Sequence, residues 1–300
     1  MKSEKLKAED KIGDFSFSFA LCTLYFVLSC IFVLVFCVSA AAQKVAILTP
    51  GKQSVPEFAE IVSDTVGKTL AVLDASMGDA AFRASKYGDP FNMTTEESKT
   101  AGRALGCDFF VLIRTETQRR TSPDRPELYE SYAAIYVVNS RSGRLIHWLI
   151  STAEAEKDSD AARKLLRKTV SVSSEIIAAV SAQKRANYEP KPVKLEELPA
   201  ENSAEAKNFR APIPYRRIKP EYTKTAFLYS VTATVEILVD LDASGIVTRT
   251  EVVRWAGFGL DESVVKAVLS MNWRAAERGG KPLPIRVLLR YNFKKTDRKP

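Results

Sequence analysis

The chain has 300 residues, of which 46% are apolar and 27% are charged. This length is typical of about two folded domains, and the composition excludes a collagen-like, low-complexity or polytopic membrane protein. A single histidine, His147, excludes every multi-histidine metal site and weakens catalytic schemes of the Ser-His-Asp or Cys-His kind.

The excess positive charge lies in the last part of the chain. Residues 210–300 contain 17 lysines and arginines against nine acidic residues, and their net charge of +8 equals that of the whole chain. Such a surface keeps a protein soluble, or it binds an anionic partner such as an acidic peptide, lipid headgroups or a cell-wall polymer. We expect no nucleic-acid partner.

An uncharged run of 24 residues, 15–38, follows four lysines near the N-terminus. A helix of this length reaches about 36 Å, which is enough to cross a bilayer core. The lysines place the N-terminus in the cytoplasm and everything from Gln43 onward outside it. Two alternatives remain for residues 1–42. Either residues 15–38 anchor a periplasmic protein in the inner membrane, or cleavage between Ala42 and Gln43 releases it into the periplasm.

Residues 43–185 are predicted to form a mixed α/β domain with the element order β-α-α-β-β-β-α. Lys44–Leu48 reads as a strand buried on both faces, and apolar spacing predicts a helix from Val55 to Asp74. Thr94 or Thr95 is expected to begin a helix that ends at Gly106. The remaining elements are three strands and a final helix, at residues 109–117, 128–138, 145–152 and 159–183.

The middle domain offers few candidates for chemistry. His147 lies in the middle of a strand, and Cys107 follows the glycine that ends a helix. The carboxylates of residues 96–97 and of residues 154 and 156 lie near helix starts, where they favour the helix dipole. No Gly-x-Ser-x-Gly, His-Glu-x-x-His or dinucleotide-binding motif occurs. We therefore predict a protein without catalytic residues, metal or cofactor.

Two short sequence segments of the middle domain, residues 104–112 and 139–143, resemble the N-terminal α/β domain of TolB and related exported lipoproteins. The resemblance implies a role in assembly or recognition. A linker with prolines and alternating charge follows at residues 186–211, which we expect to stay extended and solvated.

Residues 212–300 are predicted to form a small β-β-α-β domain, so that the whole chain belongs to the α+β class. Alternating apolar residues predict strands at Val231–Leu241, Ile246–Trp255 and Ile285–Phe293, and a helix begins at Asp261. A three-stranded antiparallel sheet with one helix across it buries enough apolar surface to be stable. On the first strand, Thr232, Thr234, Glu236 and Asp240 are expected on the polar face.

This last domain resembles the C-terminal domain of the TonB family of energy transducers. The matching motifs occur in order at Pro220-Glu221-Tyr222, Asp240 to Val247, Gly259-Leu260-Asp261-Glu262, Met271 to Ala276 and Gly280-Lys281-Pro282. The resemblance implies that an outer-membrane transporter or another envelope protein is the partner, with a proton-driven inner-membrane motor as a further partner. The apolar run lacks the histidine that TonB anchors use with that motor.

The resemblance also implies that an edge of the sheet binds a strand of the partner, by β-augmentation. We assign this edge to the last strand. Arg286 and Arg290 project from its polar face, where they either attract an acidic peptide or protect the edge against unwanted pairing. The predicted partner-binding residues are Ile285, Arg286, Val287, Leu288, Leu289, Arg290, Tyr291, Asn292 and Phe293.

Overall fold

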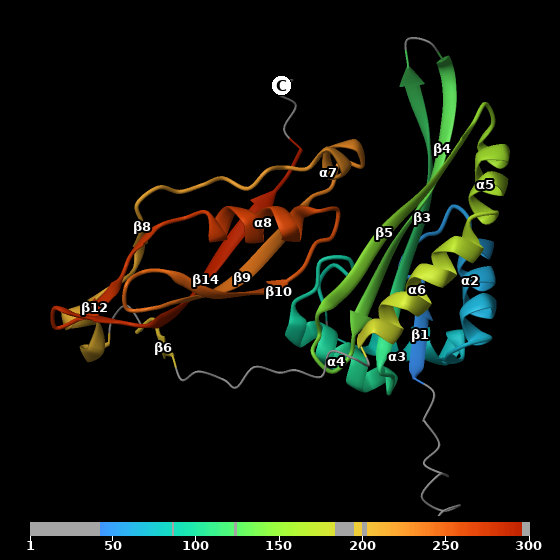
Figure 1. The fold of residues 1–300 in the computed structure, drawn as a ribbon. Coiled ribbons are helices and arrows are strands. Elements are labelled where there is room, and N and C mark those ends of the chain that lie inside the picture. Colours follow the sequence, from blue (N-terminus) through green and yellow to red (C-terminus); the bar gives the residue numbers. More distant parts are fainter. Residues whose placement is uncertain (1–42, 86, 123–124, 184–194, 200–202, 296–300) are drawn as a thin grey trace, which may run out of the picture. The chain divides into compact units, whose positions relative to one another are not determined.

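The computed structural model describes residues 43–85, 87–122, 125–183, 195–199 and 203–295. The predicted anchor at residues 15–38 lies outside the described residues. Within them, none of the helices combines the length and the apolar character that a membrane crossing requires. Below, "middle domain" means residues 43–183 and "C-terminal domain" means residues 209–295. The fold is of the α+β class (Figure 1).

The middle domain is built on a five-stranded sheet with the order β2-β1-β3-β4-β5. Strand β1 runs parallel to β2 and β3, whereas β3, β4 and β5 form an antiparallel meander. The strands are β1 (Lys44–Leu48), β2 (Ala71–Val72), β3 (Phe109–Ser122), β4 (Arg125–Asn139) and β5 (Leu145–Ala155).

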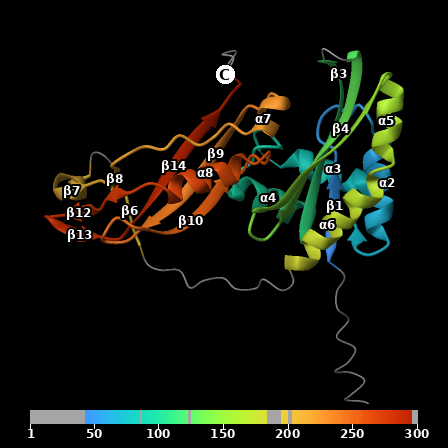
Figure 2. The ribbon, with the colours of Figure 1, turned by 45° about the horizontal axis from the view of Figure 1, so that its top comes forward.

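The two faces of this sheet have different covers (Figures 1 and 2). One face packs against the helices α2 (Glu57–Gly67), α5 (Asp158–Leu166) and α6 (Thr169–Gln183). The other packs against α3 (Ala75–Ala84), α4 (Thr95–Leu105) and part of the C-terminal domain. Because both faces are covered, β1 is buried from its second residue to its last, as its apolar sequence predicts.

The start of α4 follows the sequence-based prediction in detail. Thr94 caps the helix, and its Oγ1 atom accepts a hydrogen bond from the backbone N–H of Glu97 at 3.1 Å. The carboxylate of Glu97 accepts one in return from the backbone N–H of Thr94 at 2.7 Å. At the other end, Gly106 has a φ of 66°, a left-handed conformation that glycine adopts without steric cost.

Other predicted elements of the middle domain differ from those observed. The helix predicted to reach Asp74 ends at Gly67, because the chain then turns to pair β2 with β1. Asp74 instead caps a helix that the sequence pattern did not indicate, α3, by accepting a hydrogen bond from the N–H of Met77. The last predicted helix is divided into α5 and α6, and the three antiparallel strands extend beyond their predicted ends.

The C-terminal domain contains the predicted antiparallel arrangement of three strands with a helix across one face (Figures 1 and 2). Its central strand β9 buries Val235, Ile237, Val239 and Leu241 completely, as the alternating pattern predicts. A short helix, α7 (Lys224–Leu228), precedes the sheet. The main elements are β9 (Ala233–Leu241), β10 (Val247–Arg254), α8 (Leu260–Leu269) and β14 (Ile285–Phe293).

The described part of the linker, residues 195–199 and 203–211, is not a free extended segment throughout. Its segment β6 (Glu196–Glu197) pairs in parallel with the start of β14, so that the sheet has four strands in the order β10-β9-β14-β6. A 3-10 helix follows at Ala204–Asn208. Backbone groups at open strand edges attract such segments. The further small pairings join β7 (Phe209–Arg210) to β12 (Ala276–Arg278), β12 to β13 (Lys281–Leu283), and β8 (Ile213–Pro214) to β11 (Trp273–Arg274).

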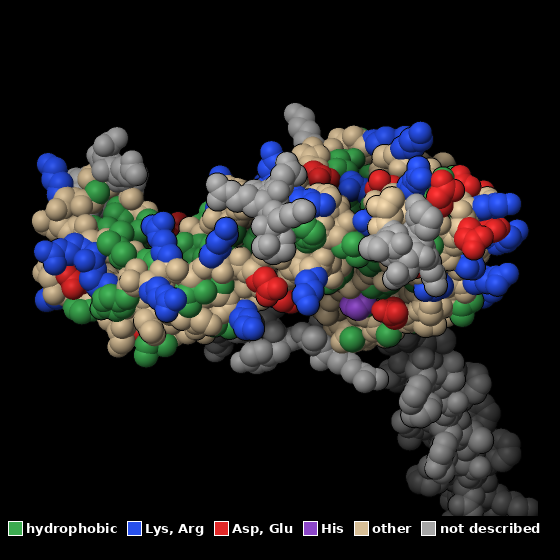
Figure 3. Space-filling model, turned by 90° about the horizontal axis from the view of Figure 1, so that it is seen from above, with side chains coloured by type: hydrophobic (Ala, Val, Ile, Leu, Met, Phe, Trp, Pro, Cys, Tyr) green, Lys and Arg blue, Asp and Glu red, His purple; other side chains and the backbone are tan. Residues whose placement is uncertain are grey.

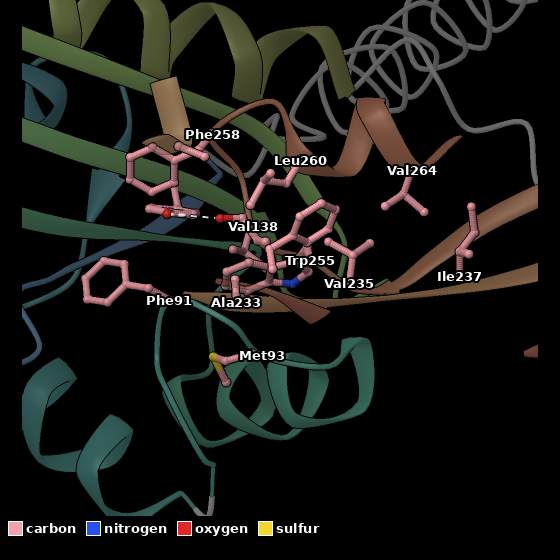
Figure 4. Packing of buried hydrophobic residues seen from close by; sticks show 14 of the residues in the cluster. Phe91, Met93, Val138, Ala233, Val235, Ile237, Trp255, Phe258, Leu260 and Val264 are labelled. Atoms are coloured by element: carbon pink, nitrogen blue, oxygen red, sulfur yellow. Dashed lines mark hydrogen bonds between the residues drawn. The ribbon is translucent and has the colours of Figure 1, made fainter. Parts of the chain in front are cut away.

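The middle and C-terminal domains share one apolar core (Figure 4). Trp255, at the end of β10, is 1% exposed, and its ring centroid lies 5.7 Å from that of Tyr136 on β4. The hydroxyl of Tyr136 donates a hydrogen bond to the backbone carbonyl of Ala256 at 3.2 Å. Figure 4 labels ten residues of this shared core: Phe91, Met93, Val138, Ala233, Val235, Ile237, Trp255, Phe258, Leu260 and Val264.

Polar contacts complete the junction. The side-chain amide of Asn92 donates hydrogen bonds to the carbonyls of Thr234 at 2.8 Å and Trp255 at 2.7 Å, and it accepts one from the N–H of Thr234. The indole Nε1 of Trp255 donates a hydrogen bond to the carbonyl of Gly143 at 3.2 Å. Burial of these polar groups with their partners in place makes the contact between the two domains specific.

Candidate strand-binding site

The edge formed by β14 is open along most of its length. On one side, all nine residues of β14 pair with β9, from Ile285 opposite Leu241 to Phe293 opposite Ala233. On the other side, within the described part of the chain, only Ile285 and Arg286 have a strand neighbour, which is β6. Residues Val287–Phe293 therefore have no second strand neighbour among the described residues, and we call this segment the open edge.

Pro199 explains why the linker covers so little of β14. Continuing the parallel register of β6 would place Leu198 opposite Val287 and Pro199 opposite Leu288. Proline has no N–H to donate to a sheet ladder, and it is found in strands chiefly at their ends or at edges. The pairing ends at Glu197, and Pro199 disfavours its extension along β14.

The two arginines of β14 form ion pairs within the sheet. Arg286 binds both carboxylate oxygens of Asp240, with Nε–Oδ1 at 2.6 Å and Nη2–Oδ2 at 2.8 Å. Arg290 binds one carboxylate oxygen of Glu236, Oε1, through both Nε at 2.6 Å and Nη2. In each pair, the arginine on β14 lies directly opposite its acidic partner on β9, which is a favourable arrangement for opposite charges.

These ion pairs change the predicted environment of the polar face. Asp240 and Glu236 were expected on a polar, solvated face, but they are 5% and 7% exposed because the guanidinium groups cover them. Arg254 of β10 adds a further cation, since its Nε atom lies 3.4 Å from Oε2 of Glu236. The positive charge of Arg286 and Arg290 is thus largely balanced within the sheet. The side chain of Arg290 is still 63% exposed.

A cavity of about 280 Å³ lies next to the open edge. Leu289 and Tyr291 of β14 form one side of it, and Met271 and Trp273, which follow α8, form another. Residues 212–218 supply the remaining wall.

A second, larger cavity of about 650 Å³ lies between the edge strands β5 and β10, next to α8. Arg144 bridges it through an ion pair with Glu251 at 2.5 Å. Strand β10 has register irregularities on both sides of its residues 249–252, and β5 has one at Ile146. Bulges of this kind blunt an edge against strand addition, so β14 offers the more regular edge of the C-terminal sheet.

The structure places the residues considered for catalysis on different elements of the middle domain. His147 is partly exposed on β5, and its Nε2 atom lies 3.5 Å from Oε2 of Glu175 on α6. Figure 3 shows the histidine at the surface beside an acidic side chain. Burial raises the pKa of the Cys107 thiol, which disfavours the reactive thiolate. Glu97 belongs to the cap of α4, and Glu96 pairs with Lys99.

The first turn of α8 holds a carboxyl group with a shifted pKa. Burial raises the pKa of Asp261 to about 7, although its side chain accepts hydrogen bonds from the backbone N–H groups of Ala256 and Gly257. Below pH of about 4 the carboxyl is protonated in both the folded and the unfolded chain. Between there and pH 7 only the unfolded chain ionises, so the contribution of Asp261 to stability is lost as the pH rises.

The quantity to compare is the difference between the free energy of unfolding of the unaltered chain and that of Asp261→Asn. We expect this difference to fall as the pH is raised from 4 to 8. The slope should reach at most about 1.4 kcal/mol per pH unit, since asparagine does not titrate. Urea unfolding at a series of pH values measures this difference. A difference that stays constant with pH would show that the carboxyl keeps its ordinary pKa in the folded chain, and one that rises would show a lowered pKa; either would contradict the prediction.

The comparisons with known proteins agree with the fold of the C-terminal domain. Residues 218–294 match the family model described as Gram-negative bacterial TonB protein C-terminal. No curated protein sequence matches the chain.

Three solved structures show similarity to parts of the chain. The TonB C-terminal domain of Pseudomonas aeruginosa is 18% identical, covers 36% of this chain and 100% of its own, with a TM-score of 0.27. A hypothetical protein of Chlamydia trachomatis is 18% identical. The match covers 49% of this chain and 100% of that protein's chain, with a TM-score of 0.30. A lipoprotein of Neisseria meningitidis is 12% identical. The match covers 48% of this chain and 99% of that protein's chain, with a TM-score of 0.26. By the family-model match, residues 218–294 of this chain are similar to the C-terminal domain of Gram-negative bacterial TonB proteins.

Proposed function

We propose that the chain is a non-enzymatic protein of the bacterial envelope, and that its open edge binds an extended segment of another envelope protein by β-augmentation. The open edge itself, Val287–Phe293 in a domain that matches the TonB C-terminal family, is the observation that carries this proposal. Unpaired N–H and C=O groups along such an edge supply affinity, and the side chains beside it supply selectivity.

The partner that best fits the proposal is an outer-membrane transporter. The predicted anchor at residues 15–38 would hold the chain in the inner membrane, and the two folded domains would then lie in the periplasm. In that arrangement the chain can transmit force from an inner-membrane motor to the transporter. The alternative is a protein cleaved after Ala42 that binds the cell wall or a secretion complex without transmitting force. N-terminal sequencing of the mature protein separates the two, because a start at Gln43 removes the link to the inner membrane.

A cysteine scan in cells tests the proposed edge. The native cysteines should first be replaced by serine, after which single cysteines are placed on the open edge at Leu288 and Asn292, both exposed. The matched control positions are Thr248 and Thr250 on β10, the opposite edge of the same sheet. We expect a bifunctional thiol-to-amine reagent to join the β14 positions, and not the β10 positions, to an outer-membrane protein that mass spectrometry then identifies. Cross-links from β10 alone would contradict the assignment of the edge.

A further inference from the structure

The cavity next to the open edge lies where an added strand would place its side chains. Residues of β14 alternate between the two faces of the sheet, and Leu289 and Tyr291 lie on the face that carries α8. In a sheet, residues directly opposite each other on neighbouring strands lie about 4.5–5.5 Å apart, with their side chains on the same face. A strand paired with β14 would therefore present every second side chain to the face of the sheet on which this cavity lies.

The walls of the cavity are held in place by backbone hydrogen bonds. Strand β8, which includes Pro214, pairs with β11, which includes Trp273. The N–H of Tyr215 donates a further hydrogen bond to the carbonyl of Asn272 at 2.9 Å. The cavity is thus formed before any ligand enters, and binding needs no rearrangement of its walls.

The chemistry of the lining indicates what the cavity accepts. Leu289, Tyr291 and Met271 offer apolar surface to an aliphatic side chain. Arg217, which is exposed, lies at the same cavity and close enough to Tyr291 to influence its pKa. Its guanidinium favours a carboxylate on the incoming strand.

Trp273 adds an independent sign of a missing partner. This residue is 5% exposed and lines the cavity, and its buried Nε1 atom has no hydrogen-bond acceptor among the described residues. A buried N–H without an acceptor costs free energy, so this position of the cavity wall is not fully satisfied in the free chain.

We propose that this cavity selects the strand that binds to the open edge. The preferred strand carries one large aliphatic residue, which enters the cavity. It also carries an acidic residue two positions away, on the same face, which meets Arg217. This selection rests on the proposed function, because the cavity is useful only if a strand pairs with β14. The parallel contact of β6 at Ile285 and Arg286 fixes the near end of the available edge.

The experiment uses the full chain and three fluorescein-labelled peptides of nine residues, built on threonine. The first has a central leucine with a glutamate two positions before it; the others replace the leucine by alanine or the glutamate by lysine. Fluorescence anisotropy measures affinity up to millimolar concentrations. Hydrogen–deuterium exchange of Val287–Phe293 shows whether each peptide pairs with the backbone.

Two substitutions separate the cavity from the edge. Leu289→Trp fills the cavity and keeps the β14 backbone, so it should weaken the leucine peptide about tenfold and leave the alanine peptide unchanged. Arg217→Glu should reverse the preference between glutamate and lysine. Arg216→Glu, which changes an exposed arginine that does not line the cavity, is its matched control and should not reverse it.

We expect the leucine peptide to bind about tenfold more tightly than the alanine peptide and to slow amide exchange along Val287–Phe293. If all peptides slow exchange there but bind equally, and Leu289→Trp has no effect, selection by the cavity is wrong and the edge remains the binding site. If no peptide slows exchange at β14 at any concentration, both the selection and the proposed function are contradicted.

Discussion

Replacing Trp255 by alanine should lower the free energy of unfolding by about 3–5 kcal/mol, which is typical for the loss of a large buried aromatic side chain. Trp255 is 1% exposed and packs where the core of the C-terminal domain meets the sheet of the middle domain. Its indole also satisfies the carbonyl of Gly143, which the substitution leaves without its donor. Urea unfolding followed by circular dichroism gives the free energy.

A second variant of Trp255 shows which part of its side chain matters, and a substitution of an exposed aromatic residue serves as the control. Trp255→Phe keeps most of the apolar contact but removes the Nε1 donor, so it should cost about 1–3 kcal/mol. Tyr215→Ala removes an aromatic ring that is 75% exposed, and its effect should stay within about 0.5 kcal/mol. A loss below 1 kcal/mol for Trp255→Ala would mean that the two domains do not share a core in solution.

Replacing Pro199 by valine should block the open edge from within the chain. Valine supplies the N–H that proline lacks and favours extended backbone, so β6 can continue along Val287 and Leu288. We expect amide exchange at the start of the open edge to slow and capture of the partner through β14 to fall about tenfold or more. Hydrogen–deuterium exchange of the full chain and the cysteine scan measure the two effects.

The matched variant is Glu197→Pro, which removes the N–H of the second residue of β6. It should release Ile285 and Arg286 from self-pairing and leave capture undiminished. If Pro199→Val slowed exchange at β14 without any loss of capture, the partner would have to bind elsewhere on the chain.

The sequence indicates the C-terminal domain well because its elements are regular. The bounds predicted for the last strand, Ile285–Phe293, are those observed, since strict alternation over nine residues admits one register only. The cap of α4 was equally predictable, because Thr94 and Glu97 have the spacing of a capping box and a glycine ends the helix.

Contacts between distant segments were harder to predict. Nothing local marks Glu196–Glu197 as a strand, since its pairing depends on the edge of β14 about ninety residues later. The burial of Glu236 and Asp240 was missed for the same reason. A signal was nevertheless present: the two acids are four residues apart on β9, as are Arg286 and Arg290 on β14, so an antiparallel register can align both pairs.

The shared core of the two domains follows from single apolar residues in loops. Trp255 and Phe258 lie between β10 and α8, where a pattern based on the period of a strand or a helix assigns them no face. Phe258 has a φ of 54°, which is unusual for an aromatic residue and places it in the turn before α8. Only the packing of the turn against the sheet of the middle domain shows what these side chains contact.

The central claim, that the open edge of β14 recruits a strand from another protein, is tested most directly by amide exchange in a complex trapped through a cysteine at Leu288. The account predicts slow exchange along Val287–Phe293 in the trapped complex and unchanged exchange along β10. Exchange at β14 that stays as fast as in the free chain, with new protection at β10 or nowhere in this sheet, would contradict it.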